Sequence, residues 1–172
     1  TNRFVIDAFR VIGRKTHRYD WAVHGVGEVQ APVDTEPCRL GTGLGYRHLI
    51  DIRRFRKPAG QVAIEWHARR GLTSAQVVLP PKAEVYLAKD PVNGDEYGEL
   101  GYTDPRMALI VRAKERQSLF VALWTFDTKP APVLKVVSGA PDHTVVIETT
   151  KGGKRTRWHL PFVDELVRKV SH

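Results

Sequence analysis

The stretch RFVIDAFRVIGRKTHRYDWAVHG, residues 3–25, decides the fold class. Residues 3–12 are apolar on both faces of an extended chain, which is typical of a strand inside a sheet. Residues 13–15 (GRK) predict a turn. The next segment alternates with a period of two, which places one set of side chains on a core face: Tyr19, Trp21 and Val23. We therefore expect two neighbouring strands, with Trp21 turned into the interior and His24 turned away from it.

Strand signals recur along the rest of the chain, separated by Gly, Pro and Asp. The predicted strands cover residues 46–55, 61–68, 72–79, 83–88, 108–113, 118–126, 134–137, 144–149 and 155–160. Residues 114–117 and Gly152-Gly153 predict hairpin turns, and the Gly- and Pro-rich segments 30–45 and 90–106 predict long loops. Helical spacing occurs only at residues 162–170, where we expect a short helix. About ten or more short strands without βα alternation predict an all-β fold, an antiparallel β-sandwich, forming one domain over residues 1–172.

Composition narrows the class of partner. The chain has 172 residues, one cysteine (Cys38) and a net charge of +8. The single cysteine excludes an internal disulfide. The positive charge favours a polyanion, either nucleic acid, an anionic membrane or an acidic polysaccharide, without choosing among them; the alternative is a solvated basic surface with no specific partner. We expect no membrane span and no nucleic-acid partner, because the sequence lacks a long apolar run, a recognition helix and an RNP-type motif. The start at Thr1, close to the first strand, predicts a piece of a longer protein.

The first candidate site lies in the Tyr19–Gly25 segment. His24 is a candidate general base, and Tyr19 is a candidate proton donor if the strand twists or bulges. Asp20 shares the face of His24 and lies about 13 Å from it along a strand, so the two would line one groove without a direct hydrogen bond. The alternative is structural: Tyr19 is a core aromatic residue and His24 is a hydrogen-bonded group without a catalytic role.

A second candidate site is a basic strip. Its members are arginine and histidine residues on or next to two predicted strands: Arg53, Arg54, Arg56, His67, Arg69 and Arg70. Arginine forks match carboxylates and sulfates, so we expect these residues, with Asp20, to bind an acidic substrate. The alternative is a solvated sheet face. We find no compact histidine spacing for a metal, no nucleophile motif and no phosphate-binding loop, so no metal site is expected in this chain.

The order of residues in two segments resembles a known family. Phe4-Val5-Ile6-Asp7-Ala8-Phe9-Arg10-Val11, Gly13, His17-Arg18-Tyr19-Asp20-Trp21 and His24-Gly25 are similar to a motif of the heparinase II/III-like polysaccharide lyases and related oligoalginate lyases. Further similarity covers Val78-Leu79-Pro80, Asp90-Pro91, Leu109–Arg112 and Leu119–Leu123. It is densest in the first 25 residues and weak after residue 130.

The resemblance implies a function for a larger parent protein. Such enzymes cleave uronic-acid polysaccharides by β-elimination, and a helical toroid carries most of the catalytic groups. The β-sheet domain packs on the toroid, closes the substrate cleft and can bind zinc. For this chain the resemblance implies a periplasmic or secreted β-sheet domain, inactive alone and without a cofactor of its own, whose partners are the toroid and an acidic polysaccharide. The alternative is a non-catalytic carbohydrate-binding or structural module that uses exposed aromatics such as Tyr97 and Tyr102.

Overall fold

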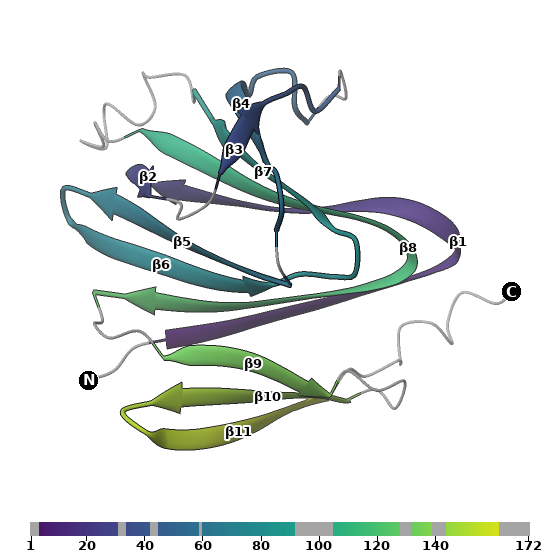
Figure 1. Ribbon diagram of the computed structural model, residues 1–172, viewed down its shortest axis with the longest axis vertical. Helices are drawn as coiled ribbons and strands as arrows, with labels where there is room; N and C mark the ends of the chain where they lie inside the picture. The colour runs from purple at the N-terminus through teal and green to yellow at the C-terminus, as the bar shows by residue number, and fades with distance from the viewer. Residues whose placement is uncertain are drawn as a thin grey trace, which may run out of the picture.

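A computed structural model describes residues 4–30, 34–41, 45–58, 60–91, 105–127, 132–138 and 144–161 (Figure 1). The strands in these ranges are β1 (Phe4–Val26), β2 (Glu28–Gln30), β3 (Thr35–Pro37), β4 (Ile50–Phe55), β5 (Gln61–Ala68), β6 (Gly71–Val78), β7 (Glu84–Lys89), β8 (Arg106–Phe126), β9 (Val133–Ser138), β10 (Thr144–Lys151) and β11 (Lys154–Pro161). All sheet pairings are antiparallel. The all-β, antiparallel sandwich expected from the sequence is confirmed. The described ranges hold no helix that is long and apolar enough to cross a membrane, and the helix predicted at 162–170 lies outside them.

Two predicted turns are wrong, because two strands are much longer than expected. The predicted turn at 13–15 lies inside β1, and the predicted hairpin turn at 114–117 lies inside β8. These strands pair with each other almost end to end, from Phe4 opposite Thr125 to Val26 opposite Arg106. The polar residues that predict turns instead form the bend of this two-stranded ribbon (Figure 1). The predicted hairpin at Gly152-Gly153 is confirmed, and both glycines have the positive φ that such a turn requires.

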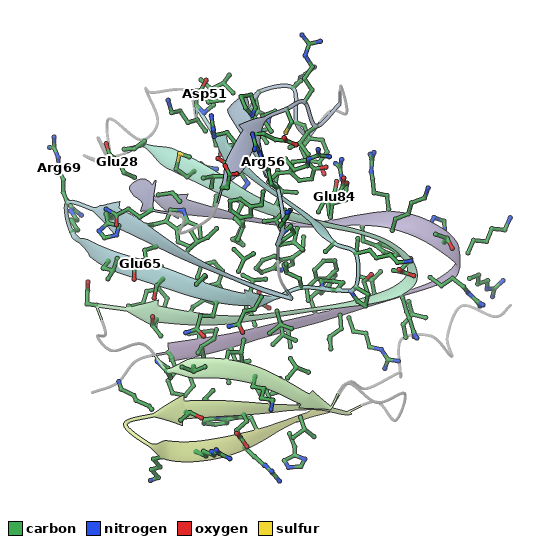
Figure 2. All side chains as sticks on the ribbon, viewed as in Figure 1. Glu28, Asp51, Arg56, Glu65, Arg69 and Glu84 are labelled. Atoms are coloured by element: carbon green, nitrogen blue, oxygen red, sulfur yellow. The ribbon has the colours of Figure 1, made fainter. Side chains whose placement is uncertain are left out.

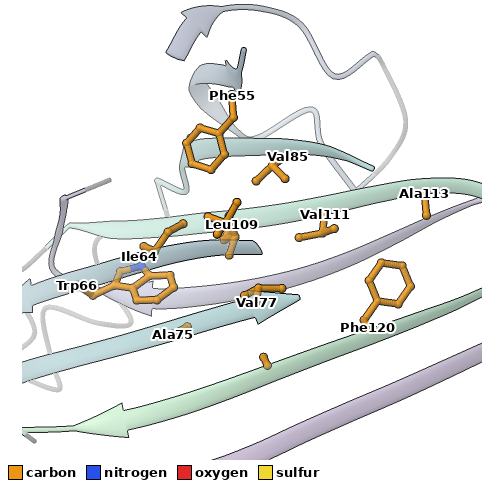
Figure 3. Packing of buried hydrophobic residues seen from close by; sticks show 12 residues of the cluster. Phe55, Ile64, Trp66, Ala75, Val77, Val85, Leu109, Val111, Ala113 and Phe120 are labelled. Carbon is orange, nitrogen blue, oxygen red and sulfur yellow. The ribbon is translucent and has the colours of Figure 1, made fainter. Parts of the chain in front are cut away.

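The ribbon belongs to both layers of the sandwich. In the first layer, the C-terminal half of β8 pairs with β6, and the sheet continues through β5 to β2. In the second layer, the N-terminal half of β8 pairs with β7, and the sheet continues through β4 to β3. Apolar side chains from the two layers meet in the core between them (Figure 3); those fully buried include Ile64, Trp66, Val77, Val85, Leu109, Val111 and Phe120. Trp21 packs on this core, stacked on Phe120, as its alternation with polar neighbours predicts.

A third layer covers the outside of the first. Strands β9, β10 and β11 form a separate three-stranded sheet, whose Leu134 and Ile147 pack with Val121 and Leu123 of β8. Gln76 of β6 joins the two sheets through polar contacts, because its side chain donates to the carbonyl of Pro132 and accepts from the amide of Leu134. Among the described strands, the N-terminal half of β1 pairs with β8 alone, so it is an edge strand there and not the central strand that its apolar composition predicts. Accordingly, Val5 and Phe9 are each 53% exposed.

Gly25 is needed where β1 passes over Trp66. A Cβ atom at position 25 would overlap the indole ring of Trp66, which is fully buried in the core. We expect Gly25→Ala to lower the free energy of unfolding by about 1–3 kcal/mol, the usual cost of overpacking a rigid core. Urea unfolding measures this loss. Gly45→Ala is the control, because nothing lies within 4 Å of a Cβ at that position. Equal stability of the two variants would contradict the steric argument.

Candidate functional site

The candidate site lies on the outer face of the second layer, opposite the core. Asp20 and His24 of β1 share this face, because they are separated by an even number of residues in a stretch of β1 with regular pairing from His17 to Val26. Residues that follow β3 pack on part of the same face, where they bury an apolar cluster that includes Leu40, Leu49, Tyr86, Ala88, Ala108 and Ile110. The second layer therefore has a partly covered outer surface, with polar side chains beside the apolar cluster.

His24 is held by a buried carboxylate. Its Nδ1 lies 2.7 Å from Asp90 Oδ2, and the Asp90 side chain is only 3% exposed. Arg106 Nη2 donates to the same oxygen over 2.6 Å, so the carboxylate has a cationic partner whatever the charge of His24. His48 Nε2 lies 3.6 Å from the other oxygen, Asp90 Oδ1.

The other ring nitrogen of His24 remains available. Within the part of the chain that the structure describes, Nε2 forms no hydrogen bond, and the His24 side chain is 37% exposed. Nδ1 also lies 3.2 Å from Arg106 Nη2, which can only donate, but the shorter contact of 2.7 Å to Asp90 Oδ2 favours the tautomer in which Nδ1 donates to Asp90 and Nε2 is unprotonated. An imidazole oriented in this way by a buried carboxylate can accept a proton from a group bound at the surface.

Asp20 is bound differently, because both of its oxygens are occupied. Arg112 forms a fork to it, with Nε 2.7 Å from Oδ1 and Nη2 2.9 Å from Oδ2, and the Tyr46 hydroxyl donates to Oδ2. The guanidinium of Arg112 also lies over two aromatic rings, 5.7 Å from the centroid of Tyr46 and 5.3 Å from that of Tyr86. The Asp20 and Arg112 side chains are 12% and 11% exposed. Asp20, a candidate substrate ligand from the sequence, is thus saturated by contacts within the protein.

These contacts shift the titration of the groups involved. Burial alone would raise the pKa of Asp20, but the hydrogen bonds from Arg112 and Tyr46 outweigh it and hold this pKa below its usual value of 3.8. Burial and the hydrogen bond to Asp20 raise the pKa of the Tyr46 phenol. Burial and the hydrogen bond to Glu84 raise the pKa of Tyr86 to about 12. At neutral pH, Asp20 is therefore a carboxylate and both tyrosines are protonated.

One turn connects the two polar clusters. Residues 45–48 form this turn, which the sequence predicts as part of a strand; β4 begins only at Ile50. Tyr46 of the turn contacts Asp20, and His48 of the same turn contacts Asp90. The turn therefore ties the His24–Asp90 pair and the Asp20–Arg112 pair into one site.

Tyr19 does not belong to this site. Its ring packs on the core between the layers, and its hydroxyl is buried without a hydrogen-bond partner among the described residues. The bulge that would turn Tyr19 towards His24 is absent from this part of β1, because the pairing with β8 is regular from His17 onwards. Tyr46 is the phenol that the structure brings to the site, and nothing in the local sequence pattern predicts it.

The basic strip predicted from the sequence does not form. Arg53 and Arg54 are on β4, whereas His67 is on β5 and Arg69 is in the turn after it, and β6, β8 and β7 lie between β5 and β4 in the sheet. In Figure 2, Arg69 lies at the tip of the β5–β6 hairpin, far from Arg56. Arg54 is also neutralised, because it forms ion pairs with Glu36 at 2.6 Å and with Glu84 at 3.7 Å. Tyr97 and Tyr102 lie outside the described residues.

The residues that complete the site come from distant parts of the sequence. Asp90 and Arg106 are the first and last residues of the long segment predicted as a loop, and Arg112 is 92 positions from Asp20. Only the cross-strand register of β1 with β8, and of β8 with β7, brings them together.

Metal ligands are not gathered at this site. Among the residues that the structure describes, no group of three or more His, Cys, Asp or Glu side chains has an arrangement that could hold a metal ion. His24, His48 and Asp90 are neighbours, but His24 Nδ1 and Arg106 already bind Asp90 Oδ2. The described side chains therefore do not fit the zinc that the lyase resemblance allows for the parent.

Comparison with known proteins adds no family assignment. No protein-family model matches the chain, and no curated protein sequence matches it.

Proposed function

We propose that this chain is the β-sheet region of a lyase that cleaves uronic-acid-containing polysaccharides by β-elimination. In this proposal it packs on a helical toroid elsewhere in the parent chain and closes the substrate cleft in the periplasm or outside the cell. The observation that carries the proposal is the pairing of His24 with the buried carboxylate of Asp90, within the segment that resembles the lyase motif. The net charge of +8 supports an acidic substrate.

The chemistry assigned to His24 is proton transfer. In the β-elimination, a base removes the proton α to the uronate carboxyl group. The electrons of that C–H bond form a carbon–carbon double bond as the glycosidic C–O bond breaks, and an acid protonates the departing oxygen. His24 Nε2 is the base in this scheme, and Asp90 is a positioning residue that holds the ring through Nδ1. The toroid supplies the groups that neutralise the uronate carboxylate.

The proton donor is less defined than the base. Tyr19 is assigned no role, because its hydroxyl is buried on the core side of β1. Tyr46 has a protonated hydroxyl on the side of β1 that carries His24, but it donates to Asp20. We therefore assign the acid to the toroid, and we assign to Tyr46 the role of keeping the 45–48 turn in place.

The test is a lyase assay on the full-length natural polypeptide that contains this chain. Alginate and heparin-type polysaccharides are the substrates, and the ultraviolet absorbance of the unsaturated uronate product is the readout. We expect turnover of at least one substrate by the full polypeptide and none by residues 1–172 alone. Absence of turnover on every uronate polymer by the full polypeptide would contradict the lyase proposal.

The alternative is a carbohydrate-binding module without catalysis, and one observation favours it. In the most strongly linked part of the site, both Asp20 oxygens are already bound by Arg112 and Tyr46, so Asp20 acts as a structural anchor. Polysaccharide binding by residues 1–172, together with an inactive full polypeptide, would support this alternative.

A further inference from the structure

A basic bulge lies where the β1–β8 ribbon bends. Ile12 pairs with Gln117 and His17 pairs with Glu115, so β1 has four residues, 13–16, where β8 has only Arg116. Extra residues in one strand of a pair bend the strand and increase its twist. Residues 14–18 are all exposed, as are Lys114 and Arg116. We call this part of the surface the basic bulge and define it by five cations: Arg14, Lys15, Arg18, Lys114 and Arg116.

Ion pairs between described residues do not neutralise the basic bulge. Among the described residues, none of its five cations forms an ion pair. The acidic residue within the bulge is Glu115, which lies opposite His17 in the backbone pairing of β1 with β8. Arg18 lies directly opposite Lys114 in the ribbon. Like charges directly opposite each other destabilise a sheet, so this pairing lowers the stability of the isolated chain. An anion bound between the two cations would offset this repulsion.

The basic bulge is continuous with the candidate site. Arg18 is two residues before Asp20, and Lys114 is two residues after Arg112, so all four side chains lie on the same face of the ribbon. His24 lies on this face six residues beyond Arg18, about 20 Å along the strand at roughly 3.3 Å per residue. A ligand bound to Arg18 and Lys114 and extended along the strand therefore runs towards His24.

We infer that the basic bulge is a subsite for the carboxylates of an acidic polysaccharide whose reacting sugar lies at His24. This inference rests on the proposed function and adds to it the residues that hold the substrate away from the reacting sugar. Arginine forks bind carboxylates through two parallel hydrogen bonds, and the bulge presents three arginines. In this inference the bulge residues bind the acidic substrate in place of Arg53, Arg54 and Arg69, which do not form one strip.

A uronate polymer fits this surface better than a nucleic acid. Proteins that bind single strands combine positive charge with exposed aromatic rings on which the bases stack. The aromatic residues next to the bulge cations are His17, which is exposed, and Tyr19, whose ring packs on the core. The bulge thus offers charge and hydrogen-bond donors with little stacking surface.

The test is binding of polyguluronate to the 172-residue chain, measured by calorimetry at several salt concentrations. We expect Arg18→Ala/Lys114→Ala to weaken binding about tenfold or more and to reduce its salt dependence. The matched control is Arg155→Ala/Arg157→Ala, which also removes two exposed cations, on β11, and we expect less than about a twofold change. Thermal unfolding checks that the bulge variant is folded. We expect it to be at least as stable as the parent chain, because the substitution removes the Arg18–Lys114 repulsion.

The outcomes separate this inference from the lyase proposal. Absence of polyguluronate binding at low salt, or equal weakening by the bulge and β11 variants, would overturn the inference. Tighter binding of single-stranded RNA than of polyguluronate at the same salt concentration would overturn the assignment to polysaccharide. If instead the bulge binds polyguluronate but the full polypeptide turns over no uronate polymer, the subsite stands and the lyase proposal fails. In an active full polypeptide, the bulge substitutions raise KM and leave kcat nearly unchanged.

Discussion

His24→Ala in the full polypeptide is expected to lower kcat for β-elimination by about 10²–10⁴-fold, the usual contribution of a positioned general base. The expectation follows from the geometry of the ring. Nδ1 is bound to a carboxylate that is 3% exposed, and the available Nε2 is on a side chain that is 37% exposed. Initial rates from product absorbance, measured across a range of substrate concentrations, separate kcat from KM.

The matched control is His67→Ala. His67 is also 37% exposed and also lies beside a carboxylate, Glu65, at 3.2 Å, but it is on β5 in the first layer. Its removal should leave kcat within about twofold. Asp90→Asn tests positioning: the ring keeps a neighbour of the same size but loses the anionic acceptor that holds Nδ1, so we expect a lower kcat with a nearly unchanged KM. A His24→Ala enzyme with unchanged kcat would remove His24 from the mechanism.

Arg112→Met is expected to lower the free energy of unfolding by about 3–5 kcal/mol, the cost of leaving a buried charge without its partner. Asp20 would remain on the outer face of the second layer, 12% exposed, with only the Tyr46 hydroxyl as donor. The substitution also removes the guanidinium from between the rings of Tyr46 and Tyr86. Urea unfolding at neutral pH measures the change.

The control for Arg112 is a double-mutant cycle with Asp20→Asn. Because the asparagine carries no charge, Asp20→Asn/Arg112→Met should be more stable than Arg112→Met alone. A second control is Arg56→Met, which removes an exposed ion pair with Asp34. A result in which Arg112→Met lowers the free energy of unfolding no more than Arg56→Met does would contradict the argument.

The pH dependence of the free energy of unfolding provides a second test of the Asp20–Arg112 pair. The pKa of Asp20 is lowered in the folded protein, so this carboxylate adds stability above its unfolded value of 3.8, and the contribution is lost as the pH falls through the folded pKa. Without Arg112, burial still raises the pKa of Asp20 while the hydrogen bonds and charge of Arg112 no longer lower it, so the charged form is less favourable at neutral pH than in the parent chain. The difference in stability between the parent chain and Arg112→Met should therefore shrink as the pH falls below about 4.

The strands of regular alternation could be predicted from the sequence because local residues determine them. β5 covers the predicted residues 61–68, with Val62, Ile64 and Trp66 buried as the period of two requires. The turn at 114–117 is wrong for a physical reason: a short polar run is typical of a hairpin, but here pairing with β1 keeps it extended. That pairing joins residues about a hundred positions apart, and local sequence carries no information on it.

The same limit explains what could be predicted of the site. The placement of His24 and Asp20 on the face opposite Trp21 follows from alternation along one strand, and the structure has them there. Their partners Asp90, Arg106 and Arg112 depend on register between strands. The expected basic strip was built from residues on two strands assumed to be close, and the sheet order places three other strands between them.

The β1–β8 ribbon has a consequence for how the molecule opens. Since its two strands run through both layers of the sandwich, neither layer can come apart without losing hydrogen bonds of the same ribbon. The two layers and the candidate site between Asp20 and Asp90 therefore form one cooperative unit of stability. The sheet of β9, β10 and β11 shares no strand with that unit and is attached through side chains such as Leu134 and Gln76, so it can detach as a separate unit while the site stays assembled.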